Sequence, residues 1–217
     1  RGEPKEGMPY GEGPALALKA AREMMDRYGL ITKNYENYVV TGDLSELPKE
    51  LDILAHLDVV PAGTEWTVTA PFEPKILQGR IYGRGTADDK GPALAALYAM
   101  RAVKELQIPL KKSVRLILGS DEECGSGDLL YYYKLEEEAP CSFTPDAEFP
   151  LINIEKGRMA PEFCGEFPEE EVLPKVVWFK SGDKVNVVPQ KAQALVRGLE
   201  RKTLEEKAAQ IGEATGV

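Results

Sequence analysis

Apolar positions follow two alternating spacings between residue 14 and residue 149. Apolar side chains at helical spacing predict helices over residues 14–29, 91–106 and 127–138. Short, nearly continuous apolar runs predict strands over residues 37–41, 51–60 and 113–118, and the run over residues 142–149 predicts a strand that ends at Asp146. Strands that alternate with helices in this way indicate an α/β fold, with an open mixed sheet and helices on both faces.

The pattern changes after Gly157. Short runs over residues 158–165, 175–179 and 186–199 predict antiparallel strands, and a helix is expected from about Lys202. We therefore expect one α/β domain over residues 1–156 and the beginning of an α+β domain over residues 157–217. The chain starts at Arg1 and ends in a charged helical stretch with nothing after it to pack against, so we expect both ends to be cut.

Charge and composition exclude several classes of protein. The net charge of -9 argues against a nucleic-acid partner and against docking on an anionic membrane. No apolar stretch approaches the roughly 18–20 residues of a membrane span, and no signal-peptide pattern opens the chain. Three cysteines without a C-x-x-C pair suit a reducing compartment, so we expect a cytoplasmic protein.

Chemistry-bearing side chains gather where the predicted strands break into turns. His56 is the only histidine of the chain. The acidic residues at the other strand ends and turns are Asp58, Asp88, Asp89, Glu122, Glu123 and Asp146. One imidazole and several carboxylates at such ends are what two neighbouring divalent cations need as ligands. The sequence therefore predicts a metal-dependent hydrolase.

The spacing around His56 and Asp88 supports specific roles. In extended chain His56 and Asp58 share a face, and a carboxylate beside a metal-binding imidazole fixes its tautomer. Glycines at 83, 85 and 91 let the backbone turn tightly around Asp88, whose carboxylate can bridge cations roughly 3.5–4 Å apart. For Asp89 we expect only a favourable charge before a helix N-terminus.

Glu122 and Glu123 are adjacent and need different roles. One of them can bind metal while its neighbour takes a proton from metal-bound water and passes it to the leaving amine. Their spacing alone does not say which glutamate has which role.

Four motifs in order carry a resemblance to a known family. They are His56-Leu-Asp58-Val-Val-Pro-Ala-Gly, Gly83-Arg-Gly-Thr-Ala-Asp88-Asp89-Lys-Gly-Pro, Asp121-Glu122-Glu123-Cys-Gly-Ser-Gly and Thr144-Pro-Asp146-Ala-Glu-Phe-Pro. Together they resemble the co-catalytic zinc peptidase family, which includes acetylornithine deacetylase, aminoacylase and carnosinase-like dipeptidases. The wording is most similar to the PepV-type bacterial dipeptidases, and the resemblance runs from about Gly7 to Glu200.

The resemblance implies a role for each site residue. His56 and Asp146 would hold one zinc, Asp88 would bridge both zincs, and Glu123 would bind the second. Glu122 would be the general base and acid, and Asp58 would orient His56. Asn186 would hold the substrate or its developing oxyanion, from a lid domain that begins at residue 157. Manganese or cobalt could replace zinc in such oxygen-rich sites.

The chain departs from the family pattern in one respect. Members of the family have a second metal-binding histidine, a lid histidine and a lid arginine, and this chain has no second histidine. The second cation site would be incomplete, so we expect a truncated chain that is inactive alone and is completed by a C-terminal half or by a homo-oligomer.

Three functions stay open from the sequence. The chain is part of an enzyme that hydrolyses dipeptide substrates, part of a related amino-acid N-deacylase, or a non-catalytic fragment that binds metal or peptide.

Overall fold

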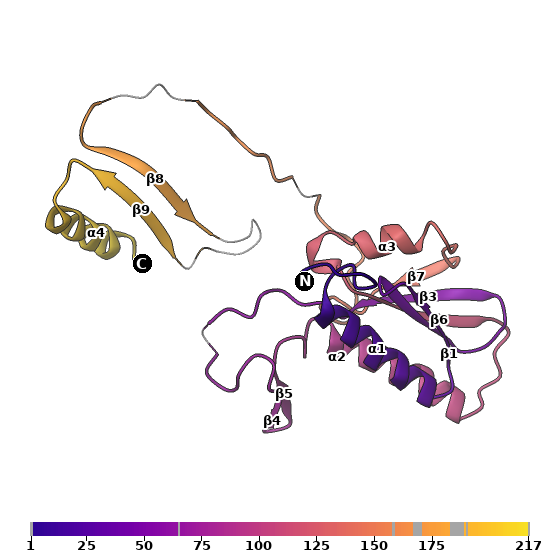
Figure 1. Ribbon diagram of the computed structural model, residues 1–217. Helices are drawn as coiled ribbons and strands as arrows, with labels where there is room; N and C mark the ends of the chain where they lie inside the picture. Colours follow the sequence, from indigo (N-terminus) through magenta and orange to yellow (C-terminus); the bar gives the residue numbers. More distant parts are fainter. Residues whose placement is uncertain are drawn as a thin grey trace. The chain divides into compact units, whose positions relative to one another are not determined.

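A mixed sheet organises the first part of the chain. The computed structural model describes residues 2–64, 66–157, 159–166, 171–182, 189 and 191–216. Within these residues the main sheet contains β1 (Ile31–Tyr35), β2 (Val39–Asp43), β3 (Lys49–His56), β6 (Ser113–Gly119) and β7 (Cys141–Phe143). Their order is β1-β2-β6-β3-β7 (Figure 1). The β1–β2 and β2–β6 pairs are antiparallel, whereas β3 runs parallel to both β6 and β7.

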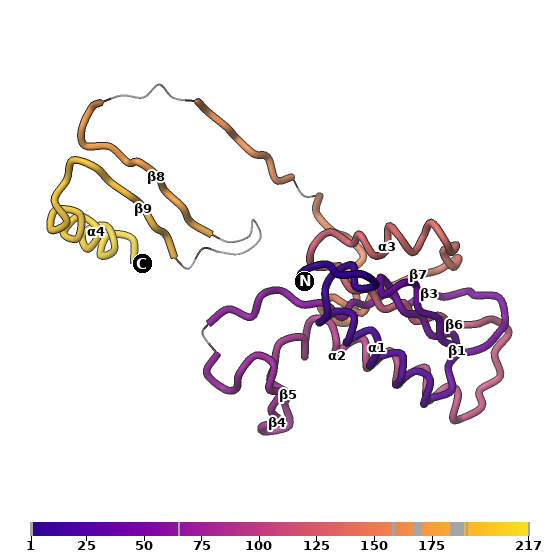
Figure 2. The backbone as a smooth tube through the Cα atoms, in the orientation of Figure 1, coloured from indigo at the N-terminus to yellow at the C-terminus, as the bar shows by residue number. Residues whose placement is uncertain are grey.

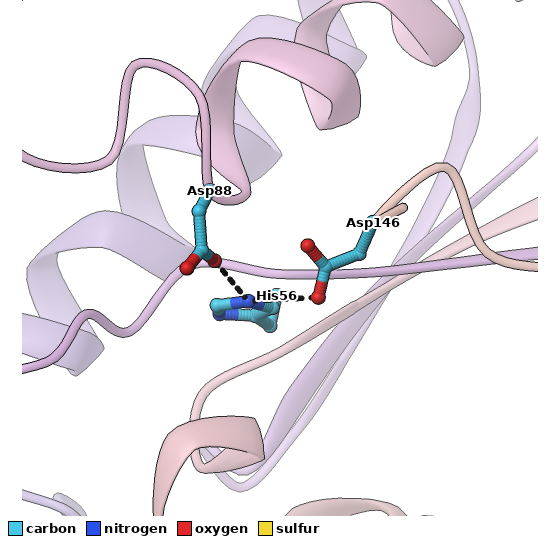
Figure 3. A group of neighbouring side chains, drawn as sticks. All are labelled: His56, Asp88 and Asp146. Carbon is cyan, nitrogen blue, oxygen red and sulfur yellow. Dashed lines mark hydrogen bonds and ion pairs between the residues drawn. The ribbon is translucent and has the colours of Figure 1, made fainter. Parts of the chain in front are cut away.

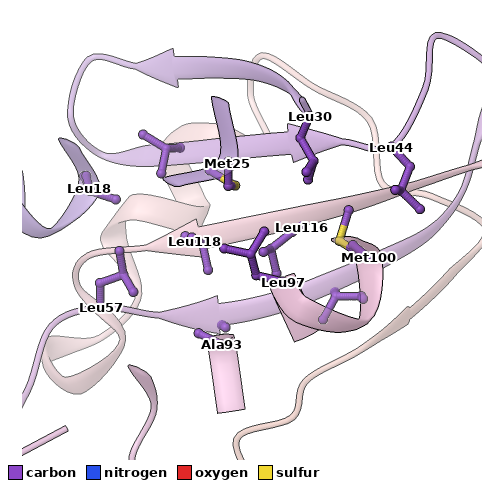
Figure 4. Packing of buried hydrophobic residues seen from close by; sticks show 13 residues of the cluster. Leu18, Met25, Leu30, Leu44, Leu57, Ala93, Leu97, Met100, Leu116 and Leu118 are labelled. Carbon is purple, nitrogen blue, oxygen red and sulfur yellow. The ribbon is translucent and has the colours of Figure 1, made fainter. Parts of the chain in front are cut away.

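Helices cover both faces of this sheet, as the sequence predicted. On one face α1 (Glu12–Arg27) and α2 (Lys90–Glu105) pack through Leu18, Met25, Leu97 and Met100 onto Leu116 and Leu118 of β6 (Figure 4). On the other face α3 (Gly127–Tyr132) packs through Tyr132 onto Ile117. Successive side chains of a strand point to opposite faces, and this alternation divides β6 between the two apolar clusters.

The ends of the elements differ from the predicted ones in a few places. Helices α1 and α2 each lie within two residues of their predicted ranges, but α3 ends at Tyr132 rather than near residue 138. Strand β1 and a hairpin made of β4 (Lys75–Leu77) and β5 (Arg80–Tyr82) were not predicted from the sequence. Figure 2 follows the chain from β3 through this hairpin and α2 to β6. The turn of the hairpin, Gln78-Gly79, has positive φ at both residues, which suits a short hairpin connection.

The chain divides into two compact units, Arg1–Asn153 and Ile154–Val217. The second unit contains an antiparallel pair of strands, β8 (Lys175–Ser181) and β9 (Ala192–Arg197), followed by α4 (Arg201–Thr215). The assignment of the two units to a catalytic and a lid domain stays a prediction.

One strand prediction was wrong. Residues 159–165 form no strand in the structure, although an extended run was expected over residues 158–165. A strand exists only where a second strand supplies hydrogen-bond partners. Met159 and Phe163 are 84% and 91% exposed, so the apolar side chains of this run are not packed against a sheet either.

Among the described residues, no helix is both long enough and apolar enough to cross a membrane.

Candidate metal centre

The topology of the sheet brings the predicted site residues to one edge. Because β3 and β6 are parallel and in register at His56 and Gly119, the segments that follow them leave the sheet side by side. Strand β7 is parallel to β3 on its other side and leads to Asp146. The turn before α2 supplies Asp88.

Two carboxylates face one nitrogen of the His56 ring. The imidazole is 3% exposed, and its Nε2 lies 3.0 Å from Asp88 Oδ1 and 3.3 Å from Asp146 Oδ2 (Figure 3). Glu122 Oε2 lies 3.9 Å from the same nitrogen. Three carboxylates from separate loops therefore converge on Nε2.

The other ring nitrogen faces Asp58. His56 Nδ1 lies 3.1 Å from the carbonyl oxygen of Asp58 and 3.3 Å from its Oδ1. A carboxylate or carbonyl on this side is the usual partner of an imidazole that binds metal through its other nitrogen. The geometry is compatible with the orienting role predicted for Asp58.

Asp58 also holds the segment that carries the two glutamates. Its two carboxylate oxygens accept hydrogen bonds from the backbone amides of Glu122 and Glu123, at 3.1 and 3.2 Å. These amides begin a short 3-10 helix, η1 (Glu122–Cys124). One buried carboxylate thus fixes both the histidine ring and the start of η1.

The electrostatic environment of His56 favours positive charge. Burial by itself lowers the pKa of the imidazole, but the hydrogen bond to Asp58 and the charges of Asp58, Asp146 and Glu122 outweigh it and raise the pKa to about 10. For Asp58, burial is in turn outweighed by His56 and by the two backbone amides, so the pKa of this carboxyl lies below its usual value. A ring and carboxylates that attract a proton so strongly also suit a cation.

The donor set fits a divalent cation. Among the described residues, two groups have ligand atoms within 4.8 Å of one another: His56 with Asp88 and Asp146, and His56 with Glu122 and Glu123. Imidazole nitrogen with carboxylate oxygens is a donor set that zinc, manganese and cobalt accept. The first group is the set predicted for one cation.

The second predicted cation has less support from geometry. Asp88 and Glu123, its expected ligands, fall in different groups that share His56. Both glutamates belong to the same group, so their two roles stay predictions. Asn186, the predicted substrate residue, lies outside the described residues.

The turn around Asp88 needs glycine, as expected. Gly85 has a φ of 85°, in the region that favours glycine. A Cβ atom on Gly91 would collide with the carbonyl oxygen of Thr86. The peptide bond between Asp88 and Asp89 is cis.

Asp89 was expected only to place a charge before a helix, but in the structure it also binds the strand that carries His56. It stands directly before α2, but its side chain is fully buried and Oδ2 accepts a hydrogen bond of 3.1 Å from the backbone amide of His56. Burial raises the pKa of this carboxyl to about 7. In the sequence, only the position of Asp89 beside the predicted ligand Asp88 pointed to the site. Its hydrogen-bond partner, the amide of His56, is 33 residues away and becomes its neighbour only in the fold.

The fold and the site together define an α/β domain with a cluster of possible cation ligands at its strand ends. Peptidase family M20/M25/M40 matches residues 53–211, and the chain belongs to this family.

Similar proteins include two curated dipeptidases. The chain is 40% identical over 194 residues to a putative dipeptidase, YtjP, of Bacillus subtilis, covering 88% of this chain and 42% of that protein. It is 41% identical over 197 residues to the Beta-Ala-Xaa dipeptidase of Lactobacillus delbrueckii, covering 89% and 41%. The chain thus spans about two fifths of the length of these relatives.

A solved structure shares the fold. The M20 family metallo-carboxypeptidase Sso-CP2 of Sulfolobus solfataricus superposes with a TM-score of 0.53 and 29% identity, over 63% of this chain and 33% of that one.

Proposed function

We propose that this chain supplies most of a two-metal centre that hydrolyses dipeptides. The observation that carries the proposal is the convergence of Asp88 and Asp146 on His56 Nε2, at 3.0 and 3.3 Å. The family and the dipeptidases among its relatives support peptide hydrolysis as the reaction.

Each carboxylate has a proposed place in this centre. His56, Asp88 and Asp146 hold the first cation, and Asp88 also reaches a second cation that Glu123 binds. When bound, such cations act as Lewis acids and lower the pKa of water to near neutrality. Zinc is the proposed metal, and manganese or cobalt would fit the same donors.

Glu122 is proposed as the group that moves the proton. Its side chain is 50% exposed, so it can reach solvent and substrate. Burial of the rest of the group raises the pKa of its carboxyl. A raised pKa brings a carboxyl closer to the operating pH, where it can accept a proton from water and return it to the leaving amine.

The remaining ligands are proposed to come from residues beyond this chain. His56 is its only histidine, and the relatives are more than twice as long. We propose that a C-terminal portion like theirs, or a second copy of the chain, completes the second cation site. Asn186 would then hold the substrate from the unit Ile154–Val217, acting as a lid.

A cytoplasmic location is part of the same proposal. All three cysteines, Cys124, Cys141 and Cys164, are free thiols in the structure. Free thiols are typical of a reducing compartment.

The test begins with cation binding by the chain. Titration with zinc, manganese or cobalt should show binding, and His56→Ala should weaken it by at least about 10–100-fold. Loss even of a group that only hydrogen-bonds to a metal ligand lowers metal affinity by that factor. An exposed-site control, Lys202→Ala, should bind as the unmodified chain does. Equal binding by His56→Ala would reject the centre.

Activity separates the candidate functions. β-Alanyl dipeptides, other dipeptides and N-acetylated amino acids are offered to this chain and to the chain joined to the C-terminal portion of the Lactobacillus relative. We expect hydrolysis of dipeptides by the joined chain only. Preference for N-acetylated amino acids would indicate a deacylase instead, and robust turnover by the chain alone would overturn the proposal of an incomplete second site.

A further inference from the structure

The segment that carries Glu122 and Glu123 is closed at its base by hydrogen bonds. We call residues 119–128 the glutamate loop. Asp128, at its C-terminal end, is 1% exposed. Asp128 Oδ2 accepts hydrogen bonds from the backbone amides of Ser120 and Asp121, the latter at 3.0 Å, and Oδ1 accepts one from Leu129 at 2.8 Å.

Asp121 makes the reciprocal connection. Its Oδ2 accepts a hydrogen bond of 3.2 Å from the amide of Gly127. Its carbonyl oxygen also accepts hydrogen bonds from the amides of Cys124 and Ser126, at 3.1 and 2.9 Å. An aspartate at each end of the glutamate loop therefore binds backbone amides of the other end.

Asp128 lies so close to Gly119 that position 119 has no room for a side chain. A Cβ atom on Gly119 would collide with Asp128 Oδ2. Gly119 is also the residue paired with His56 across the sheet. The base of the glutamate loop thus lies directly beside the strand end that carries His56.

A simpler role for Asp128 is a favourable charge in the first turn of α3. Helix α3 has only six residues, and two of the three amides bound by Asp128 belong to Ser120 and Asp121, which lie at the N-terminal end of the glutamate loop and outside α3. A charge that served the helix alone would not need these two partners.

We infer that Asp128 is a positioning residue that holds Glu122 and Glu123 at the metal centre by tying the two ends of the glutamate loop together. The inference rests on the proposed cation centre. Asp58 fixes the amides of the two glutamates themselves, and Asp128 fixes the base from which they project. Removal of a buried acceptor leaves its donor amides without a partner, and the loop must then rearrange to reach water.

The first measurement needs no metal. Amide hydrogen exchange is compared in the cation-free chain, in Asp128→Ala, in Asp128→Asn and in Ile117→Val. Ile117 is a buried residue of β6 outside the site, so its variant controls for lost stability. We expect the amides of Ser120 and Asp121 to exchange at least about 10-fold faster in Asp128→Ala, beyond any change shared with Ile117→Val. Asparagine keeps one carbonyl oxygen and should give an intermediate effect.

The second measurement uses Co²⁺ alone as the probe. Asp128→Ala should bind Co²⁺ about 10–100-fold more weakly and with an altered absorption spectrum, whereas Ile117→Val should match the unmodified chain. If Asp128→Ala does not fold, Asp128→Asn decides, with a smaller loss in the same direction.

The two proposals fail in different ways. Unchanged exchange at Ser120 and Asp121, or unchanged Co²⁺ affinity and spectrum while the unmodified chain binds, would overturn the role of Asp128. If the unmodified chain does not bind Co²⁺ at all, the metal centre is rejected, and the exchange rates alone decide whether Asp128 ties the glutamate loop.

Discussion

Each nitrogen of the His56 ring faces a different set of oxygens. Nδ1 meets Asp58, which is buried and bound to backbone amides, while Nε2 meets Asp88 and Asp146, which are partly exposed. An acceptor whose lone pairs are already engaged suits an orienting role, and acceptors open toward solvent suit ligands. At the scale of single residues, the surroundings of each carboxylate therefore distinguish the group predicted to orient the ring from those predicted to bind metal.

The two adjacent glutamates give a prediction at this scale. Glu122→Gln should keep the cation affinity of the chain within about 3-fold, whereas Glu123→Gln should lower it by at least about 10-fold. The reason is that losing a metal ligand lowers metal affinity more than changing a residue beside that ligand. In a longer chain that hydrolyses dipeptides, Glu122→Gln should also lower kcat by about 2–4 orders of magnitude, the usual scale for acid–base catalysis.

Calorimetric titration and steady-state kinetics check both effects. Glu46→Gln, on the exposed stretch before β3, removes a charge without touching the site and serves as the control. Loss of cation binding in Glu122→Gln together with normal binding in Glu123→Gln would mean that the two roles are reversed.

Among the elements, the close contact of α1 with β2 depends on a glycine in the strand. A Cβ atom on Gly42 of β2 would lie 2.6 Å from Met25 Sδ and 3.1 Å from Leu30 Cδ2. Met25 is fully buried in the apolar cluster between α1 and the sheet. The helix can lie this close to the strand because position 42 has no side chain.

Gly42→Ala should therefore destabilise the first unit by about 1–3 kcal/mol, the usual cost of an overpacked core. Gly13→Ala is the matched control, because nothing lies within 4 Å of the added atom and the residue is inside α1. Alanine is a better helix former, so this control should be neutral or stabilising by up to about 1 kcal/mol. Urea unfolding measures both, and equal effects would contradict the close packing of α1 on β2.

At the scale of the whole molecule, all described site residues belong to one of the two units. The residues from His56 to Asp146 lie within Arg1–Asn153. A ligand that binds only the folded form stabilises the part of the chain that binds it. Cation binding should thus stabilise the first unit and leave Ile154–Val217 unchanged.

The two tryptophans allow this to be measured. Trp66 lies in the first unit and Trp178 in the second, so Trp178→Phe and Trp66→Phe variants each report on one unit. With cation at 100 times its Kd, the free energy of unfolding reported by Trp66 should rise by about 2.7 kcal/mol. It should return to its original value when a chelator is added. The transition seen by Trp178 should not move. A similar shift in His56→Ala would show that the cation stabilises the chain from somewhere else.

Patterns of neighbouring residues were enough to predict the local features of this chain. Apolar periodicity predicted α1 and α2 within two residues, and the polar side chains after the apolar runs identified His56, Asp88 and Asp146 as neighbours in space. These inferences succeed because a helix stripe, a buried strand and a glycine-bounded turn each depend on residues close together in the chain.

Contacts between groups far apart in the chain depend on how its elements pack. Asp89 binds the amide of His56 and Asp58 binds those of Glu122 and Glu123, across 33 residues or more of chain. The expected strand over residues 158–165 failed for the same reason: a strand needs a hydrogen-bonding partner, and a partner is a property of the fold. Periodicity reports which face of an element is buried, but only the packed sheet selects the backbone amides and carbonyls that those buried side chains reach.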